Sequence, residues 1–129
     1  MESHVLVVDD DPIFNMMAKV LLKNSGITEN PCIFSDGKAA LSYLESIAVS
    51  GQQIVLFLDI NMPVVSGWDV LNYLQAHPLC NQIQVVMVTS SIDNADKKKA
   101  MSYPLVIDFL VKPLKLDSLE NVKHLLTGN

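Results

Sequence analysis

The sequence predicts an α/β fold, in which a parallel five-stranded sheet carries five helices on its two faces. Short apolar runs alternate along the chain with segments whose apolar residues recur at helical spacing. The runs are hydrophobic at nearly every position, which is typical of strands buried on both faces of a parallel sheet. A length of 129 residues fits one domain with one sizeable core. Strands and helices in this alternation favour a doubly wound sheet.

The first strand and helix are predicted within residues 4–26. Residues 4–8 (HVLVV) form the first apolar run, and the Asp11-Pro12 pair after it is typical of a helix N-cap and a first helical residue. Gly26 is expected to end this helix. The side chains expected to form its buried stripe are Ile13, Met16, Met17, Val20 and Leu21.

A second strand, a second helix and a third strand are predicted before residue 60. The second strand is short and spans 31–35 (PCIFS), and Asp36 opens the helix that follows it. The residues expected to face the core from this helix are Ala40, Leu41, Leu44 and Ile47. Residues 54–59 (IVLFLD) are apolar until the final carboxylate and form the third strand.

The second half of the chain continues the alternation. A helix after the loop 61–67 is expected to bury Val70, Leu71 and Leu74 and to run to about His77. Strands are predicted at 85–91 and 106–111, with a more polar helix at 93–102 between them. The residues expected to face the core from the last helix are Leu116, Leu119, Val122, Leu125 and Leu126.

Polar side chains stand at the ends of four of these strands. They are Asp9 and Asp10 after the first strand, Asp59 at the third, Thr89 at the fourth and Lys112 after the fifth. Parallel strands direct their carboxyl ends to one edge, where a reversal of strand order leaves a crevice for ligands. We therefore expect these side chains to form one site, whereas Asp11 and Asp36 are expected to cap helices.

The residue types at this edge indicate phosphoryl chemistry. Two carboxylates about 4 Å apart repel each other by roughly 4 kcal/mol at an effective dielectric constant near 20. Converging acids therefore need a cation, and oxygen ligands favour a hard one such as Mg²⁺, with Mn²⁺ as a substitute. A cation, a lysine and a hydroxyl group meet the needs of phosphoryl transfer, in which a carboxylate can act as the nucleophile.

Four stretches of the sequence, VVDDDP, LFLDINMPVVSGWDVL, VVMVTSS and DFLVKP, carry a family resemblance. Together they resemble the receiver domain of two-component response regulators, of the chemotaxis-regulator (CheY-like) type. Each stretch alone is a weak signal, but the four occur in the family's order and spacing and span nearly the whole chain. The resemblance implies a flavodoxin-like sheet in the order 2-1-3-4-5 and a single receiver domain over residues 1–129, with no output domain.

The resemblance also assigns a role to each site residue. Asp9 and Asp10 match the acidic pair that holds Mg²⁺, with Asp10 the more direct ligand. Asp59 matches the phosphoacceptor, and Asn61 would offer its backbone carbonyl to the metal. The remaining matches are Thr89 as the switch hydroxyl, Lys112 as the lysine that pairs with the phosphoryl group, Phe109 as the rotating aromatic residue and Lys112-Pro113 as a cis peptide bond.

The function that follows is a phosphorylation-activated switch. The resemblance implies that Asp59 accepts a phosphoryl group from a histidine kinase or a histidine phosphotransfer protein. The surface formed by the last strand and the last two helices would then change and control binding to a downstream protein. On this interpretation the protein catalyses only its own phosphorylation and dephosphorylation and is not an enzyme in the ordinary sense.

Composition excludes several other classes of protein. A net charge of −5 and a pI of about 4.9 argue against nucleic acid and anionic membranes as partners. No apolar run approaches the roughly 20 residues that a membrane span needs, and the first residues do not resemble a signal peptide. The two cysteines, Cys32 and Cys80, follow no disulfide or metal-ligand pattern, which favours a reducing cytoplasm.

Two alternative functions share part of the pattern. Phosphatases of the haloacid-dehalogenase type also combine aspartate, threonine or serine, lysine and Mg²⁺ on a parallel sheet. Their nucleophile is usually followed two residues later by an acid, where this chain has Asn61, and they need room for a substrate-binding cap. A flavodoxin-like nucleotide or flavin module would need a glycine-rich phosphate loop after the first strand, and none is present.

Overall fold

A computed structural model describes residues 4–48, 51–78, 80–90 and 93–127 of the chain. Its elements are, in order, β1 (His4–Val8), α1 (Pro12–Ser25), β2 (Cys32–Phe34), α2 (Gly37–Ala48), β3 (Ile54–Asp59), α3 (Gly67–Gln75), the 3₁₀ helix η1 (Cys80–Gln82), β4 (Ile83–Thr89), α4 (Asn94–Met101), β5 (Val106–Val111) and α5 (Leu116–Thr127). The predicted alternation of strands and helices is confirmed. Ser91, the last residue of the predicted fourth strand, lies outside the described residues.

The five strands form one parallel sheet in the order β2-β1-β3-β4-β5, which confirms the predicted fold class. The strands are aligned so that their carboxyl ends lie together. Val8 at the end of β1 pairs with Phe34 and with Leu58, and Thr89 at the end of β4 pairs with Val111. The loops after β1, β3, β4 and β5 therefore leave the sheet at one edge, where the predicted site residues lie.

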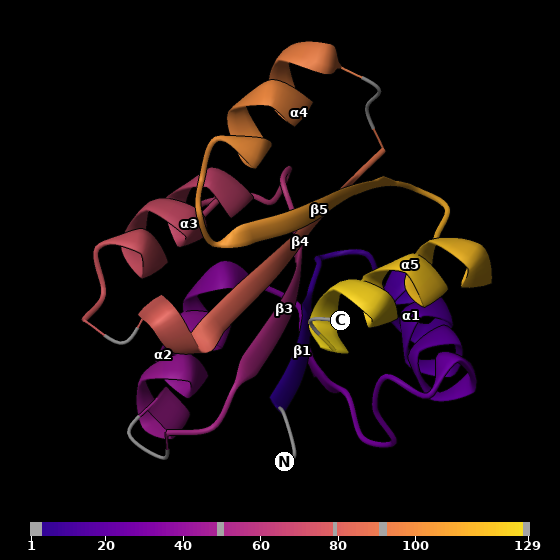
Figure 1. The fold of residues 1–129 in the computed structure, drawn as a ribbon. Helices are drawn as coiled ribbons and strands as arrows, with labels where there is room; N and C mark the ends of the chain where they lie inside the picture. Colours follow the sequence, from indigo (N-terminus) through magenta and orange to yellow (C-terminus); the bar gives the residue numbers. More distant parts are fainter. Residues whose placement is uncertain (1–3, 49–50, 79, 91–92, 128–129) are drawn as a thin grey trace.

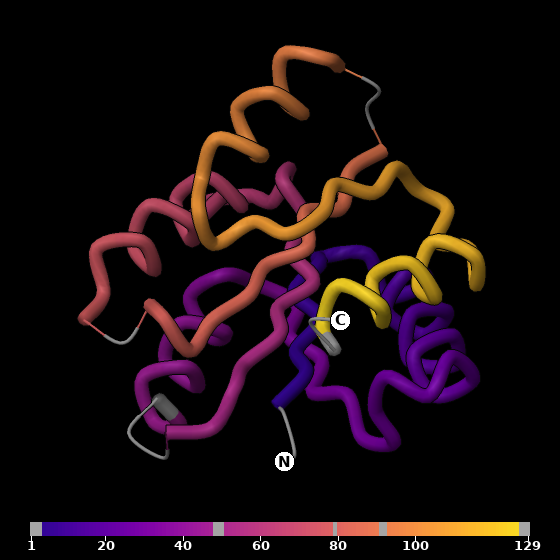
Figure 2. The backbone as a smooth tube through the Cα atoms, viewed as in Figure 1, coloured from indigo at the N-terminus to yellow at the C-terminus, as the bar shows by residue number. Residues whose placement is uncertain are grey.

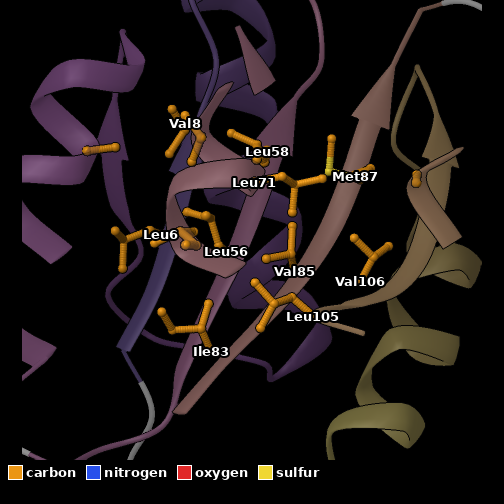
Figure 3. Close-up of a cluster of buried hydrophobic side chains, with 14 of the residues drawn as sticks. Leu6, Val8, Leu56, Leu58, Leu71, Ile83, Val85, Met87, Leu105 and Val106 are labelled. Carbon is orange, nitrogen blue, oxygen red and sulfur yellow. The ribbon is translucent and has the colours of Figure 1, made fainter. Parts of the chain in front are cut away.

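Helices cover the sheet on both faces, with α1 and α5 on one side and α2, α3 and α4 on the other (Figures 1 and 2). Each face of the sheet has its own buried cluster, because successive residues of a strand point to opposite faces. Figure 3 shows the cluster under α2 and α3, in which Leu71 of α3 meets alternate residues of the central strands, including Leu56, Leu58 and Met87. The cluster under α1 and α5 contains Phe14 and Leu119.

Helix α1 buries a different face from the one predicted. Of the five residues predicted for the buried stripe, Leu21 is partly buried and packs against the core. The side chains of Ile13, Met16, Met17 and Val20 are 70%, 69%, 46% and 53% exposed. The buried residues of the helix are Phe14, Asn15, Ala18, Leu22 and Ser25. The prediction was wrong because α1 is apolar around most of its circumference, so helical spacing fits two faces equally well. Packing against the sheet and α5 selects one of them.

Smaller differences have the same origin. Of the five residues expected to face the core from α5, Leu119 and Val122 are fully buried, whereas Leu116 and Leu125 are 43% and 42% exposed. Strand β2 lies at the edge of the sheet, so its three residues are only half-buried.

The caps of α1 were predicted correctly. Asp11 caps α1, and Gly26 ends it in the left-handed conformation that glycine adopts without strain.

Candidate functional site

Three carboxylates converge at the carboxyl edge of the sheet. Asp9, Asp10 and Asp59 each offer an oxygen within 4.8 Å of the others. Asp9 and Asp59 are almost fully buried, at 1% and 5% exposure, whereas Asp10 is exposed. The cluster, called the acidic pocket below, therefore combines two buried carboxylates with one that is open to solvent.

The turn after β1 holds the first two acids in place. The backbone N–H of Asp11 donates to Asp9 Oδ1 (2.9 Å), and Asn15 Nδ2 donates to the backbone oxygen of Asp9 (2.8 Å). The carboxylate of Asp11 accepts the N–H groups of Ile13 (2.9 Å) and Phe14 (3.4 Å), so it is occupied as the N-cap of α1. The third acid of the DDD run thus starts the helix, as predicted, and leaves the other two for the pocket.

The loop after β3 holds Asp59. The N–H of Gly67 donates to the backbone oxygen of Ile60 (2.9 Å), and a capping box between Ser66 and Asp69 fixes the start of α3. Val64 adopts φ 66°, a conformation that is rare for a β-branched residue. The N–H of Val65 donates to the carbonyl oxygen of Pro63 (2.8 Å) and closes a γ-turn around Val64, so the loop is tightly folded.

Lys112 brings a positive charge to the pocket from the end of β5. Its Nζ lies 2.7 Å from Asp9 Oδ2 and 3.9 Å from Asp59 Oδ1. Its backbone N–H donates to the backbone oxygen of Thr89 (2.7 Å), which ties the ends of β4 and β5 together. The Lys112-Pro113 peptide bond is cis, as the resemblance implied.

The pKa of Asp59 is raised to about 6, first by burial and then by the neighbouring negative charge of Asp9. The ammonium group of Lys112 and the backbone N–H of Asn61 act in the opposite direction but do not offset the burial. The negative charge of Asp59 is thus poorly compensated by the protein alone. A cation at this position would relieve that imbalance.

The residues present fit a hard divalent cation. All three acidic groups offer carboxylate oxygens, which are the ligands that Mg²⁺ prefers, and one of them is open to solvent for the waters that Mg²⁺ retains. Asn61 is exposed and follows Asp59 by two residues, with its N–H 3.4 Å from Asp59 Oδ1. The described cysteine and histidine residues do not join the cluster.

The two switch candidates lie on one face of the sheet. Phe109 is 9% exposed and belongs to the same buried cluster as Met87 and Ala100 of α4. Thr89 follows Met87 by two residues, so strand alternation places it on that same face, and it is fully buried. Phe109 therefore packs in the cluster that includes Ala100 of α4, and Thr89 lies on the same face at the carboxyl end of β4.

A family model of the response regulator receiver domain matches residues 5–123. The chain belongs to this family. As a receiver domain it is a switch of two-component signalling, and the acid cluster, Thr89 and Lys112 lie together at one edge of its sheet.

Relatives of this receiver differ in length. The probable methanogenesis regulatory protein FilR2 of Methanothrix harundinacea is 30% identical over 118 residues, which cover 90% of this chain and 76% of that protein. The two-component response regulator-like protein PRR37 of Oryza sativa is 31% identical, but the match covers 92% of this chain and only 15% of that protein. A two-component response regulator from Cytophaga hutchinsonii matches in structure with a TM-score of 0.90, at 28% identity and over 98% of both chains.

Three residues at the site were not singled out from the sequence. Asn15 holds the backbone of Asp9, Gly67 lies against the backbone of Asp59, and the ring of Phe14 lies beneath the ammonium group of Lys112. The Ser-Gly pair at the start of α3 was a detectable signal for a tight turn. The two α1 residues gave no signal, because the helix was predicted to bury its other face. Among the described residues, no helix is long and apolar enough to cross a membrane.

Proposed function

We propose that this receiver accepts a phosphoryl group on Asp59 from the phosphohistidine of a histidine kinase or a histidine phosphotransfer protein. The observation that carries the proposal is the convergence of three carboxylates with Lys112, which lies within 4 Å of both Asp9 and Asp59. Such a pocket is costly in the absence of a ligand, and a cation together with a phosphoryl group would satisfy its charges.

In the proposed reaction a carboxylate oxygen of Asp59 attacks phosphorus. The phosphorus–nitrogen bond of the donor breaks, its electron pair returns to the imidazole, and Asp59 becomes an acyl phosphate. Asp9, Asp10, Asp59 and the backbone carbonyl of Asn61 are the proposed ligands of Mg²⁺, for which Mn²⁺ can substitute. When bound, the cation neutralises charge on the phosphoryl oxygens during transfer.

Lys112 and Thr89 are proposed to bind the phosphoryl oxygens after transfer. Lys112 already extends toward Asp59, and its backbone N–H donates to the backbone oxygen of Thr89, so the two residues stand at joined ends of β4 and β5. Movement of Thr89 toward Asp59 would change the packing of Phe109 and thereby the surface of α4, β5 and α5. In this mechanism the charge added by phosphorylation shifts the equilibrium between two arrangements of Thr89, Phe109 and the surface above them.

The exposed stripe of α1, formed by Ile13, Met16, Met17 and Val20, is the proposed docking surface for the phosphodonor. It begins at the N-terminus of α1, next to the acidic pocket, and unbranched methionines adapt well to a partner. Between Pro12 and Ser25 the helix carries Lys19 and Lys23 and no acid, although the whole chain has a net charge of −5. An amphipathic helix with acidic residues would complement this surface.

The phosphorylated receiver would bind a downstream protein or pass the phosphoryl group on, and would hydrolyse its own acyl phosphate. We propose no turnover of external substrates, no direct contact with nucleic acid and no insertion into membranes. The proposed compartment is the cytoplasm, in keeping with two cysteines that are both free thiols.

Labelling by a small phosphodonor tests the covalent step. With Mg²⁺ and acetyl phosphate, the intact mass should rise by one phosphoryl group, which peptide mapping should place on Asp59. The adduct should be stable in acid and labile in base. Asp59→Asn should abolish it, whereas Asp11→Asn, which alters the cap beside the pocket, should retain most of it. Undiminished labelling of Asp59→Asn would refute the assignment, and steady hydrolysis of phosphomonoesters would favour a phosphatase.

Calorimetry tests the metal site separately. Asp10→Ala should weaken Mg²⁺ binding by about tenfold or more, because it removes one of the three carboxylates. Glu29→Ala removes the same charge from the loop between α1 and β2, at the opposite edge of the sheet, and should leave the affinity unchanged. Equal affinities for the wild type and Asp10→Ala would contradict the proposed ligand set.

A further inference from the structure

The ammonium group of Lys112 has an aromatic partner in addition to its two carboxylates. Its Nζ lies 4.5 Å from the centroid of the Phe14 ring, over the ring face. That geometry is a cation–π contact, in which the negative face of the ring attracts the charge. The lysine thus lies among Asp9, Asp59 and Phe14, three groups from three different segments of the chain.

The ring of Phe14 is held rigidly. Phe14 is 7% exposed and packs in the buried cluster with Leu110 and Leu119, and its backbone N–H is bound by the Asp11 cap. Lys112, in contrast, has a flexible stem with several rotatable bonds, and its side chain is 18% exposed. The ring therefore provides a fixed point to which the mobile ammonium group returns.

The three partners of Lys112 differ in how they respond to the proposed reaction. A cation in the pocket would take the oxygens of Asp9 and Asp59, and a phosphoryl group on Asp59 would change its charge. The attraction of the Phe14 ring depends on neither event, because it comes from the ring's own quadrupole. Phe14 is thus the partner whose attraction stays the same through the cycle.

We propose that Phe14 is the positioning residue for Lys112, keeping its ammonium group within reach of Asp59 while the carboxylates are occupied. This inference rests on the proposed phosphorylation of Asp59, and it adds that Phe14 helps to set the rate of that reaction. Phe14 touches neither the donor nor the reacting atoms and acts through Lys112. If the ring served only as core packing, the rate of Asp59 phosphorylation would depend on the shape of the ring but not on its electron density.

Fluorinated phenylalanine at position 14 separates these two roles. Successive fluorine atoms weaken the negative ring face while keeping the ring's shape and apolar character. The rate of labelling by acetyl phosphate at saturating Mg²⁺ should fall stepwise along the series. The trifluorinated protein and Phe14→Leu should be about 3- to 30-fold slower than the wild type, equivalent to about 0.7 to 2 kcal/mol at 1.4 kcal/mol per tenfold. Phe14→Tyr, which retains an electron-rich ring, should keep the rate within about twofold.

A second measurement observes the contact directly in the protein without metal or donor. The Cε protons of Lys112 lie near the ring face and should show an upfield NMR shift, which Phe14→Leu should abolish and Phe14→Tyr should retain. Phe57→Leu is the matched control. Phe57 is 1% exposed in the same cluster, and its variant should lose stability without moving the Lys112 signal.

The outcomes distinguish this inference from the proposed function. If the wild type is labelled on Asp59 but the fluorinated proteins react as fast, Phe14 is core packing and the positioning role is overturned while the function stands. An unshifted Lys112 signal in the wild type overturns the contact itself. If the wild type is not labelled on Asp59, the proposed function fails, and the role of Phe14 in it fails as well.

Discussion

Gly67 lies directly against the backbone of Asp59. A Cβ atom built on Gly67 would lie 2.3 Å from the backbone oxygen of Asp59 and 2.8 Å from the Cα of Ile60. Both contacts involve backbone atoms, which cannot rotate away as a side chain can. The start of α3 and the end of β3 are therefore packed so closely that glycine alone fits between them, and this packing sets the position of the proposed phosphoacceptor.

Gly67→Ala should accordingly disturb the pocket. The alanine must push β3 and α3 apart, which should lower the free energy of unfolding by about 1–3 kcal/mol and weaken Mg²⁺ binding. Chemical denaturation and calorimetry would measure the two effects. Gly51→Ala is the control, because Gly51 lies in the loop between α2 and β3, at the opposite edge of the sheet. Its positive φ of 76° makes alanine destabilising there, but the new Cβ would meet nothing within 4 Å, so metal affinity should not change. Metal affinity unchanged in Gly67→Ala would show that the loop adjusts without moving Asp59.

The raised pKa of Asp59 predicts a pH-dependent stability. Because its pKa is about 6 in the folded protein against an ordinary value of 3.8, the folded state binds this proton more tightly than the unfolded state does. The free energy of unfolding should therefore fall as the pH rises from about 4 to about 6, with the loss complete above that range. The ionised carboxylate is thus a destabilising group at neutral pH when no metal is bound.

Asp59→Asn removes this penalty. In metal-free buffer near neutral pH the variant should be more stable than the wild type, by on the order of 2 kcal/mol, and the difference should vanish below about pH 4. Urea unfolding across this pH range would measure it, with Glu29→Gln, an exposed acid far from the pocket, as a control that should show no such trend. Mg²⁺ should stabilise the wild type more than the variant. A variant that is less stable than the wild type at neutral pH would contradict the origin of the shift.

The exposed stripe of α1 should matter for protein donors and not for small ones. Met16→Gln combined with Val20→Thr should change stability by less than about 0.5 kcal/mol, because both side chains are largely exposed. Transfer from a phosphohistidine protein that labels the wild type should slow by about tenfold or more, while labelling by acetyl phosphate stays constant. Leu125→Gln, at a similarly exposed position on α5, is the control. Equal slowing with both donors would place the defect in the pocket instead.

Helix α4 is the element whose packing should change on activation. Ala100 is the one residue buried within Asn94–Met101, and contacts at the surface hold the helix to α3. Lys99 Nζ lies 4.2 Å from the Trp68 ring centroid, Trp68 stacks on Tyr103 at 6.3 Å, and the Tyr103 hydroxyl donates to Asn72 (2.8 Å). An element with so few buried contacts opens readily.

Beryllofluoride with Mg²⁺ should therefore alter amide exchange within residues 89–115 and the fluorescence of Trp68, which reports on the contact with Tyr103. Asp59→Asn should show neither response. The ring of Phe109 is already buried, at 9% exposure, and it lacks a hydroxyl group. The change in its packing should therefore be modest. Exchange that changes only in the loops around Asp10 and Asp59 would mean that the domain binds the phosphoryl analogue without transmitting the signal.

The sequence by itself determined the sheet, the edge at which the site lies and the residues at that edge. Strand periodicity and caps are local properties, so runs such as 54–59 and the Asp11 cap could be predicted without tertiary contacts. Parallel strands must also end at a common edge, which brought Asp9, Asp59 and Lys112 together in the prediction before any distance was known.

Only the tertiary structure decided which face of α1 is buried and which partners Lys112 has. The helix offers two apolar faces, and the choice between them depends on how the sheet and α5 pack against Phe14 and Leu22. That choice placed the Phe14 ring beneath Lys112 and turned Met16 outward to solvent. The close approach of Gly67 to Asp59 could not be predicted from the sequence either. Contacts between separate segments depend on packing in three dimensions, and a local sequence pattern contains no information about that packing.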